Sequence, residues 1–283
     1  MFGEFYAFLQ SILPQHALSR LAGWLGNCRW PWIKNILIFL FMLRYRVTLA
    51  IAEKTKISDY SSFNEFFTRR LNASARSIAS DENIIISPAD GVISQIGDIT
   101  AGKLLQAKGK NYSLTELLTR ADLAVHFERG RFATIYLNPS DYHRVHMPFS
   151  GKLLEMIYVP GTLFSVNPAT TESVSRLFAR NERIVSLFET SFGYMAVIMV
   201  GSMLVGSMQT VWAGKISPRS RKTIQKIQYY NQSFELLRGA EMGHFEMGST
   251  VILLCSSSHM VWNEALHANM RVKIGQGLGI QKN

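Results

Sequence analysis

Two segments of the sequence carry side chains suited to acid–base chemistry. Asp90 lies between Pro88 and Gly91, and an aspartate in such a place is most often a turn residue whose carboxylate bonds its own backbone. His143 and His146 stand close together in the sequence, and imidazoles exchange protons near neutral pH. Each of these three side chains therefore has both a structural and a catalytic interpretation.

A third segment, Met247-Gly248-Ser249-Thr250, supplies a candidate nucleophile, Ser249, directly before the apolar run 251–255. Glycine has no Cβ, so the backbone there can adopt a strained conformation that brings the next hydroxyl close to the preceding carbonyl. Together with Asp90 and His146, Ser249 suggests a charge-relay set. The G-x-S-x-G elbow of lipases is absent, which points to an unusual serine rather than an ordinary hydrolase nucleophile.

The two histidines also have the types and spacing of metal ligands, but the rest of the sequence does not favour a metal site. A metal would need a third and a fourth ligand, and neither an H-E-x-x-H motif nor a closely spaced cysteine pair is present. The two cysteines, Cys28 and Cys255, are too few for a disulfide framework or a cysteine-based zinc site. We therefore expect no metal.

The elements that must position these residues are predicted to be mostly β-strands. Runs rich in branched apolar residues end at prolines, glycines or asparagines, which is typical of short strands separated by turns. Strands are expected at 84–86, at 133–137, at 195–205 (as two strands or one broken at Gly201) and at 250–255. Short helices are expected at 61–71, 114–120 and 172–179. The predicted fold class is α+β, with N-terminal membrane-facing helices followed by a mostly antiparallel β domain.

The first 50 residues differ from the rest of the chain. Apolar residues recur at helical spacing up to Pro14, which should end a first helix, and again over 18–25. Paired tryptophans then lead into the apolar run 36–43, which Lys34 and Arg44 flank. This run is too short to cross a membrane, which takes about 20 residues. Tryptophans and cations are typical of a helix that lies in the membrane interface, and a buried core helix is the alternative.

Composition limits the classes of protein and of partner. The chain has 283 residues, of which 47% are hydrophobic and 18% charged, and this excludes an intrinsically disordered chain. Its net charge of +10 predicts an acidic partner. The basic residues form only short clusters without an aromatic RNA-binding signature, so we expect no nucleic acid. An anionic membrane is the better candidate.

Taken in order, the motifs resemble those of the bacterial-type, pyruvoyl-dependent phosphatidylserine decarboxylases. The resemblance covers nearly the whole chain and rests on FFTRRL (66–71), SPADGVIS (87–94), DYHRVHMP (141–148), PGTLFSVN (160–167), FARNER (178–183), VWAG (211–214) and GAEMGHFEMGST (239–250). Two departures occur: Met247 stands in place of the usual leucine of an LGST motif, and His244 and Glu246 replace residues that are often basic. Both departures leave Gly248 and Ser249 intact.

The resemblance implies that the chain cleaves itself between Gly248 and Ser249. Asp90 and His146 would act as the relay that activates the Ser249 hydroxyl for attack on the Gly248 carbonyl, and later removes the Cα proton of Ser249. The products would be a β chain, 1–248, and an α chain, 249–283, whose first residue becomes a covalent pyruvoyl group. That group would form a Schiff base with the substrate amine and act as an electron sink. His143 is a candidate for returning a proton to the substrate.

The implied reaction converts phosphatidylserine into phosphatidylethanolamine and CO2, a step of phospholipid biosynthesis. Because the substrate lies in an anionic membrane, 1–60 would be a helical interfacial segment and 61–283 the catalytic domain. The expected location is the cytoplasmic face of the cell membrane, with peripheral attachment. The sequence does not give the oligomeric state, and a homo-oligomer of the two-chain unit is compatible with it.

Three other interpretations fit parts of the pattern. A membrane-associated serine hydrolase that uses Asp90, His146 and Ser249 would stay a single chain and react with fluorophosphonates. A noncatalytic membrane scaffold would respond to Ser249→Ala only in its stability. A pyruvoyl enzyme for a soluble amino acid is the third, and the apolar N-terminal segment argues against it.

Overall fold

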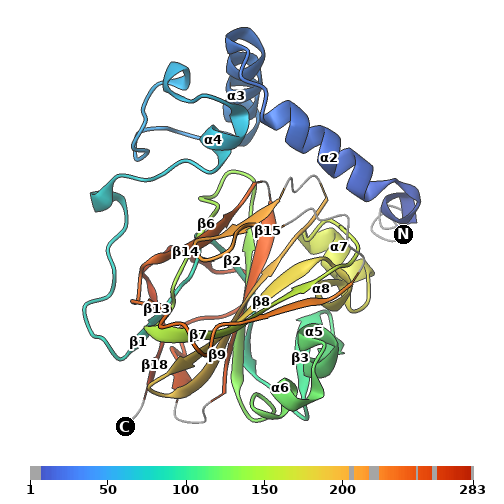
Figure 1. The fold of residues 1–283 in the computed structure, drawn as a ribbon, viewed down its shortest axis with the longest axis vertical. Coiled ribbons are helices and arrows are strands. Elements are labelled where there is room, and N and C mark those ends of the chain that lie inside the picture. The colour runs from blue at the N-terminus through green and yellow to red at the C-terminus, as the bar shows by residue number, and fades with distance from the viewer. Residues whose placement is uncertain (1–7, 204–206, 217–222, 247, 257–259, 282–283) are drawn as a thin grey trace.

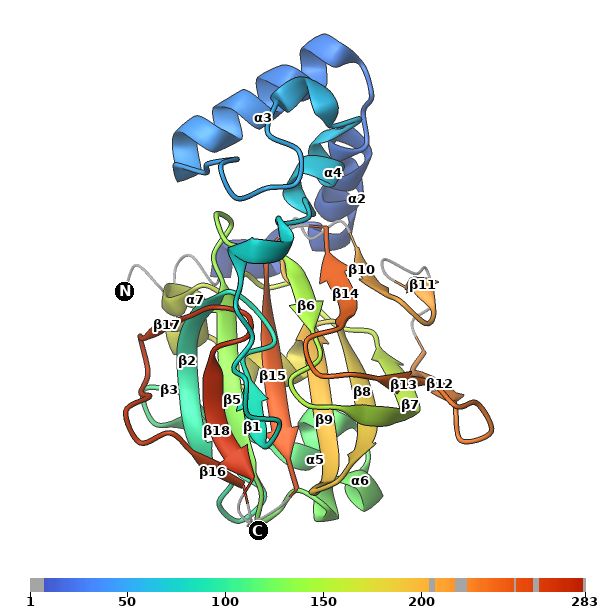
Figure 2. The ribbon, with the colours of Figure 1, turned by 90° about the vertical axis from the view of Figure 1, so that its left-hand side faces the viewer.

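The chain folds into a helical lobe that lies across one end of a β domain (Figures 1 and 2). The computed structural model describes residues 8–203, 207–216, 223–246, 248–256 and 260–281. The lobe contains a helical turn at 8–12 and three further helices: α2 (Gln15–Gly26), α3 (Pro31–Tyr45) and α4 (Phe63–Phe67). As expected, Pro14 separates the first two helical segments, because its ring fixes φ and it has no N–H to donate.

The ends of α4 follow from local hydrogen bonding. Ser62 is the N-cap, and its hydroxyl accepts from the Glu65 N–H at 3.2 Å. The prediction of a helix over 61–71 is wrong in length, because α4 begins at Phe63 and ends at Phe67. Beyond it, Leu71 forms a β-bridge with Ala52, which draws the chain into an extended conformation.

Buried aromatic side chains hold the lobe together. Ile38 of α3 is fully buried against Phe63, Phe66 and Phe67 of α4, and the whole cluster covers residues 38–67. The ring of Phe41 contacts all three of these phenylalanine rings edge-on, with centroids 5.3 to 5.9 Å apart. The part of the lobe from α3 to α4 therefore shares one core, which extends across residue 60.

The β domain is built on one large antiparallel sheet. Its strand order is β12-β7-β8-β9-β15-β5-β2-β17, and β13 pairs with β7 at the same edge as β12. The bounds are β2 (Gly91–Asp98), β5 (Arg131–Leu137), β7 (Gly151–Val159), β8 (Arg183–Thr190), β9 (Gly193–Val200), β12 (Gln225–Gln228), β13 (Glu235–Leu236), β15 (Ser249–Cys255) and β17 (Arg271–Val272). The predicted α+β class with mostly antiparallel strands is confirmed.

Three smaller sheets accompany the large one. The first has the order β1 (Ile84–Ile86), β18 (Gly277–Gln281), β16 (Met260–Trp262). The second has the order β11 (Gly214–Lys215), β10 (Met208–Thr210), β14 (Glu241–Phe245), β6 (Arg144–His146). The third is the hairpin β3 (Lys103–Ala107) and β4 (Lys110–Ser113).

Short helices and turns complete the domain, and two of the predicted helices differ from the observed ones. The helices are α5 (Leu114–Leu118), α6 (Ala121–Val125), α7 (Pro168–Ser173) and α8 (Leu177–Arg180), and 3-10 turns lie at Ile57–Asp59 and Ala73–Ala75. The helix expected at 114–120 ends early because Thr119 takes a left-handed conformation, with φ 58°. The helix expected at 172–179 is split, because Val174 is extended and Arg176 is left-handed.

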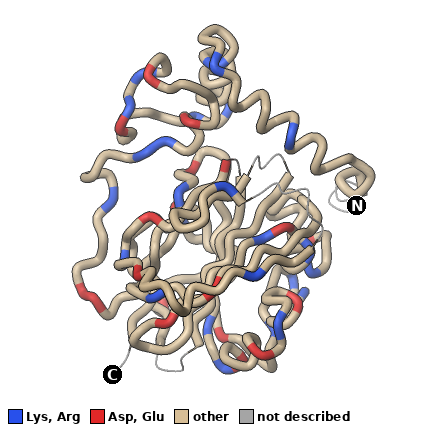
Figure 3. The backbone as a smooth tube through the Cα atoms, viewed as in Figure 1, with Lys and Arg blue, Asp and Glu red and all other residues tan. Residues whose placement is uncertain are grey.

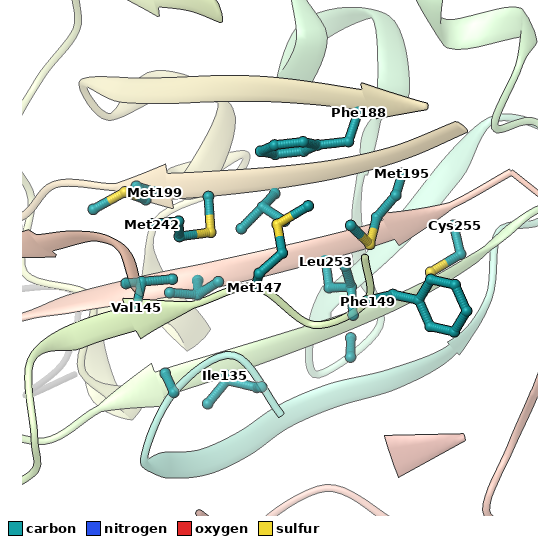
Figure 4. Close-up of a cluster of buried hydrophobic side chains, with 14 of the residues drawn as sticks. Ile135, Val145, Met147, Phe149, Phe188, Met195, Met199, Met242, Leu253 and Cys255 are labelled. Carbon is teal, nitrogen blue, oxygen red and sulfur yellow. The ribbon is translucent and has the colours of Figure 1, made fainter. Parts of the chain in front are cut away.

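The large sheet is buried on both faces. Val251, Leu253 and Cys255 of β15 face a core cluster beneath the first two of the smaller sheets, which Figure 4 shows in close-up. Ile252 and Leu254 face the opposite cluster, on the side of the short helices. Because side chains alternate along a strand, a strand covered on both faces reads as a continuous apolar run, as 251–255 does.

Candidate active site

Ser249 begins the central strand β15 and is fully buried. It lies opposite Leu137 of β5. Residues two apart on a strand point to the same face, so the Ser249 side chain shares the face of Val251 and Leu253, which β6 and β14 help to cover. Its Oγ has no hydrogen-bond partner among the residues that the structure describes. A buried hydroxyl that forms no structural hydrogen bond is available for chemistry, and this fits a serine that becomes a modified group.

The carbonyl before Ser249 is held by a residue that the sequence analysis missed. The Ser202 hydroxyl donates to the Gly248 carbonyl oxygen at 2.6 Å. A Cβ placed on Gly248 would meet only this hydroxyl oxygen within 4 Å, at 3.9 Å, so packing leaves space for a side chain there. Met247, a noted departure from the family motif, lies outside the described residues.

Asp90 lies in the turn between β1 and β2 and is only 5% exposed. Its carboxylate accepts two hydrogen bonds from Arg76 Nε, at 3.0 and 3.1 Å, and one from the Ile274 backbone N–H, at 2.9 Å. Arg76 Nη2 also contacts it, and this ion pair raises the pKa of the Arg76 guanidinium. The carboxylate therefore binds groups far away in the sequence, which the local turn interpretation did not anticipate.

His146 is the last residue of β6, and its ring is oriented by a backbone carbonyl. Nδ1 lies 2.8 Å from the Gly239 oxygen, so we assign the proton to Nδ1 and the free lone pair to Nε2. Nε2 is buried and has no hydrogen-bond partner within the described part of the chain. Burial lowers the pKa of His146, while the Gly239 hydrogen bond and the charges of Glu241 and Asp90 oppose that shift. The ring is therefore a neutral base with an unused acceptor.

His143 is fully buried beneath the helical lobe. Its ring stacks on Phe67 of α4 with centroids 4.2 Å apart, and its Nε2 lies 3.1 Å from the Asn138 oxygen. Burial, assisted by the positive charge of Arg69, lowers the pKa of His143 to about 3. Asn138 directly follows Leu137, the strand partner of Ser249, so His143 and Ser249 approach the same end of β5.

The structure brings Asp90, His146 and Ser249 to one end of the sheet, but the described contacts do not join their side chains by hydrogen bonds. The backbone N–H of His146 donates to the Pro88 oxygen at 2.8 Å, which ties β6 to the turn that carries Asp90. Between the side chains themselves, however, the described contacts include no hydrogen bond from Asp90 to His146 or from His146 to Ser249. Arg76 binds the Asp90 carboxylate, where a linear relay would place His146. The Gly239 carbonyl binds the His146 ring, where the relay would place Asp90. No motif in the sequence marked Arg76, and Gly239, although it opens the motif 239–250, was given no role there.

A cavity of about 300 Å³ lies beside the Gly248 carbonyl, between the helical lobe and the β domain. The lobe contributes an aromatic wall, and the domain contributes Gly248 and Ser202. The aromatic residues of the wall are Phe41, Tyr45, Phe63 and Phe67. The candidate cleavage site is therefore reached from an apolar space that is covered by α3 and α4.

The outer surface of the lobe is strongly apolar. Its exposed large apolar side chains, each between 38% and 73% exposed, are Phe8, Leu9, Ile12, Leu13, Leu21, Trp24, Leu25, Trp30, Trp32, Ile36, Phe39, Leu40 and Leu43. Basic residues outnumber acidic ones in the lobe and in the segment leading to β1 (Figure 3). Lys34 is an exception to the expected flanking cations, because it is buried and its Nζ donates to Asn35 Oδ1 at 2.8 Å. Among the described helices, none is long and apolar enough to cross a membrane.

The described residues contain no group of three or more His, Cys, Asp or Glu side chains arranged to hold a metal ion. A covalent group derived from Ser249 would need no such ligands, but it would need room beside it for a substrate. Gly248, the residue before Ser249, lines the cavity of about 300 Å³, and the Ser249 hydroxyl has no hydrogen-bond partner among the described residues.

Comparisons with known proteins place the chain in a family. A family model described as phosphatidylserine decarboxylase matches residues 63–280, and a second, described as PSD, matches residues 5–46. The chain is 48% identical over 274 residues to a phosphatidylserine decarboxylase proenzyme of Saccharophagus degradans, covering 96% of each chain. Proenzymes of the same name from Ectopseudomonas mendocina and Methylococcus capsulatus are 50% and 48% identical, over 95% and 98% of this chain and 96% of each relative. The chain belongs to the phosphatidylserine decarboxylase family.

Proposed function

We propose that this protein is a proenzyme that cleaves itself between Gly248 and Ser249 and then decarboxylates phosphatidylserine to phosphatidylethanolamine. Its family membership supports the reaction class, a carboxy-lyase of phospholipid biosynthesis that matures from a proenzyme. The observation that carries the cleavage is the junction itself. Ser249 presents a buried hydroxyl that has no partner in the described part of the chain, directly after a carbonyl that is already held by a hydrogen bond.

In the proposed cleavage, Ser249 Oγ attacks the Gly248 carbonyl carbon and loses its proton to His146. The lone pair on Nε2 of the neutral His146 ring suits it as that base, and the Gly239 carbonyl fixes the ring through Nδ1. Asp90 completes the proposed set, and its negative charge favours the protonated ring that forms. Arg76 and the Ile274 N–H hold Asp90 in place.

The acyl shift produces an ester, which opens by β-elimination. The base removes the Cα proton of Ser249, the Cβ–Oγ bond breaks, and the carboxylate of Gly248 leaves as the end of the β chain. The aminoacryloyl residue that remains becomes an imine when its Cβ gains a proton and its nitrogen loses one, and water hydrolyses this imine with loss of ammonia. The α chain, 249–283, would begin with a pyruvoyl group, which supplies an electron sink for the electrons left behind by CO2.

We assign the return of a proton to the substrate to His143. In the uncleaved chain this ring is neutral near pH 7, because its pKa is about 3. A substrate carboxylate that enters the adjoining space would raise this pKa and allow the ring to take up the proton that it later gives back. Phe67 and Asn138 fix the ring plane for that transfer.

The helical lobe suits a substrate held in a membrane. We propose that 1–60 binds an anionic membrane surface peripherally, on the cytoplasmic face of the cell membrane, and that 61–283 carries the catalytic machinery. Trp24, Trp30 and Trp32 are each more than 60% exposed, and tryptophans favour the headgroup region. The aromatic wall of the cavity continues from this lobe to Gly248, which gives an apolar path for a lipid to the reacting residue.

An intact mass spectrum of the purified protein tests the proposal. We expect two chains of 248 and 35 residues, the smaller one lighter than a chain with a free serine terminus by the mass of ammonia. Ser249→Ala should give a single chain of 283 residues without decarboxylase activity. A single unbroken chain from an active preparation would contradict the cleavage mechanism and favour a serine hydrolase.

A further inference from the structure

Ser202 occupies a position that no sequence motif assigns to a function. It follows Gly201 just beyond the end of β9, and its side chain is almost fully buried, with 5% of the residue exposed. Its hydroxyl donates to the Gly248 carbonyl oxygen at 2.6 Å, which is a short hydrogen bond for two neutral groups. This oxygen belongs to the carbonyl that the proposed cleavage attacks.

The strand register explains how Ser202 reaches Gly248. β9 and β15 are antiparallel, and Val200 lies opposite Thr250 at the end of their ladder. Two residues further along each strand, Ser202 and Gly248 come opposite one another. At this point, beyond the last backbone pair of the ladder, the Gly248 carbonyl accepts a hydrogen bond from the Ser202 side chain.

Asn181 fixes the backbone that carries Ser202. Its side chain is fully buried, and its Nδ2 donates to the Gly201 oxygen at 2.9 Å and to the Phe164 oxygen at 2.8 Å. The Gly201 N–H donates to the Glu182 oxygen at 2.8 Å. The backbone of Gly201 is thus held from both its N–H and its carbonyl, so the hydroxyl of the next residue is positioned before any reaction begins.

We propose that Ser202 is a catalytic residue of self-cleavage, whose hydroxyl stabilises the oxyanion that forms on Gly248. The inference rests on the proposed cleavage at this bond. When Ser249 Oγ bonds to the Gly248 carbonyl carbon, the C=O electron pair moves to the oxygen and the serine proton passes to the base. The tetrahedral centre then expels the Ser249 nitrogen, which takes up a proton, and an ester remains.

A donor already in place is most useful at the moment when charge develops. A hydrogen bond to a charged oxygen is about twice as strong as one to a neutral oxygen, so the Ser202 contact strengthens in the transition state. The donor is held in place before the reaction, so no reorganisation is needed when the charge develops. The neighbouring Ser249 hydroxyl cannot serve, because it is itself the nucleophile.

The test follows the conversion of newly made precursor into two chains after a short pulse of cell-free synthesis. Removing a single oxyanion donor typically slows a reaction by about 100-fold or more. We therefore expect Ser202→Ala to slow cleavage by about 100-fold, and at least by about tenfold. Ser202→Thr keeps a hydroxyl and should recover a rate near that of the wild type. Ser186→Ala is the matched control, since Ser186 is a fully buried serine of β8, and it should cleave at the wild-type rate.

Folding is checked separately from cleavage. The thermal unfolding midpoint of Ser202→Ala is compared with that of the unaltered sequence, with both chains carrying Ser249→Ala so that neither can be cut. Similar midpoints together with slow cleavage of Ser202→Ala support the proposal. Ser202→Ala at the wild-type rate would refute it, as would Ser202→Thr being as slow as Ser202→Ala. A wild-type precursor that remains whole would refute the proposed function itself, and the role of Ser202 with it.

Discussion

Leu43 offers a direct test of the proposed membrane surface. It lies near the end of α3 with 70% of its surface exposed. Leu43→Ala removes three carbons, each worth about 0.8 kcal/mol on burial, so at this exposure the membrane can take up about 1.7 kcal/mol of their transfer free energy. At about 1.4 kcal/mol for each factor of ten, the Kd for vesicles should rise about 16-fold.

The assay is flotation with vesicles of phosphatidylserine and phosphatidylcholine, in a chain that also carries Ser249→Ala so that the lipid is not consumed. Leu237→Ala is the matched control, because Leu237 is 69% exposed but lies in the β domain, after β13. We expect this control to bind like the parent chain. Unchanged binding of Leu43→Ala, or an equal loss in Leu237→Ala, would refute the assignment of the interface to the helical lobe.

Three further predictions concern the site, and their stability measurements use the uncleavable Ser249→Ala background. Arg76→Gln leaves the Asp90 carboxylate buried without its cation, so the free energy of unfolding in urea should fall by about 3 kcal/mol, and a change near zero would contradict the ion pair's role. His143 has a pKa of about 3 in the fold and a reference pKa of about 6.5, so as pH falls between these values the unfolded chain gains a proton that the folded chain does not. The contribution of His143 to this loss, about 1.4 kcal/mol per pH unit, should be absent from His143→Gln, while that of His146, whose pKa is also lowered, remains. The denaturation midpoint should therefore fall less between pH 7 and pH 5 in His143→Gln than in the parent. Asn181→Ala removes a buried amide that contacts Gly201, and should destabilise by about 2 to 4 kcal/mol; in the otherwise unaltered chain it should also slow cleavage, and normal cleavage would show that Ser202 is positioned without it.

The sequence predicted only the strands with strong local signals: those expected at 84–86, 133–137, 195–205 and 250–255 correspond to β1, β5, β9 and β15, and β9 ends at Val200. Strands such as β2, β7 and β8 were not predicted. The run 250–255 is continuous and apolar, and it becomes β15 with a core on each face. Helix lengths were less predictable. The helix at 61–71 stops at Phe67 because Leu71 pairs with Ala52, and a pairing between distant residues leaves no mark on either segment alone.

The site divides in the same way. Asp90, His143, His146 and Ser249 were predicted from their residue types and motifs, and the fold brings their backbones to one end of the large sheet; their catalytic roles stay predictions. The groups that hold them were not found. Ser202 reaches Gly248 only through the register of β9 and β15, and a register is a property of two paired strands rather than of either sequence.

The position of β15 has a consequence for the fate of the two chains. A cut before Ser249 would create the end of a 35-residue chain inside a completed sheet, with its first strand between β9 and β5 of the longer chain. Of the strands that follow it, β17 and β18 pair with β2 and β1, which also belong to the longer chain. The short chain would thus be retained like a peptide fragment that complements a truncated protein, held by ladders and core contacts instead of a peptide bond. Separating the two would require unfolding the β domain, so the reactive terminus is anchored by the same core that makes the fold stable.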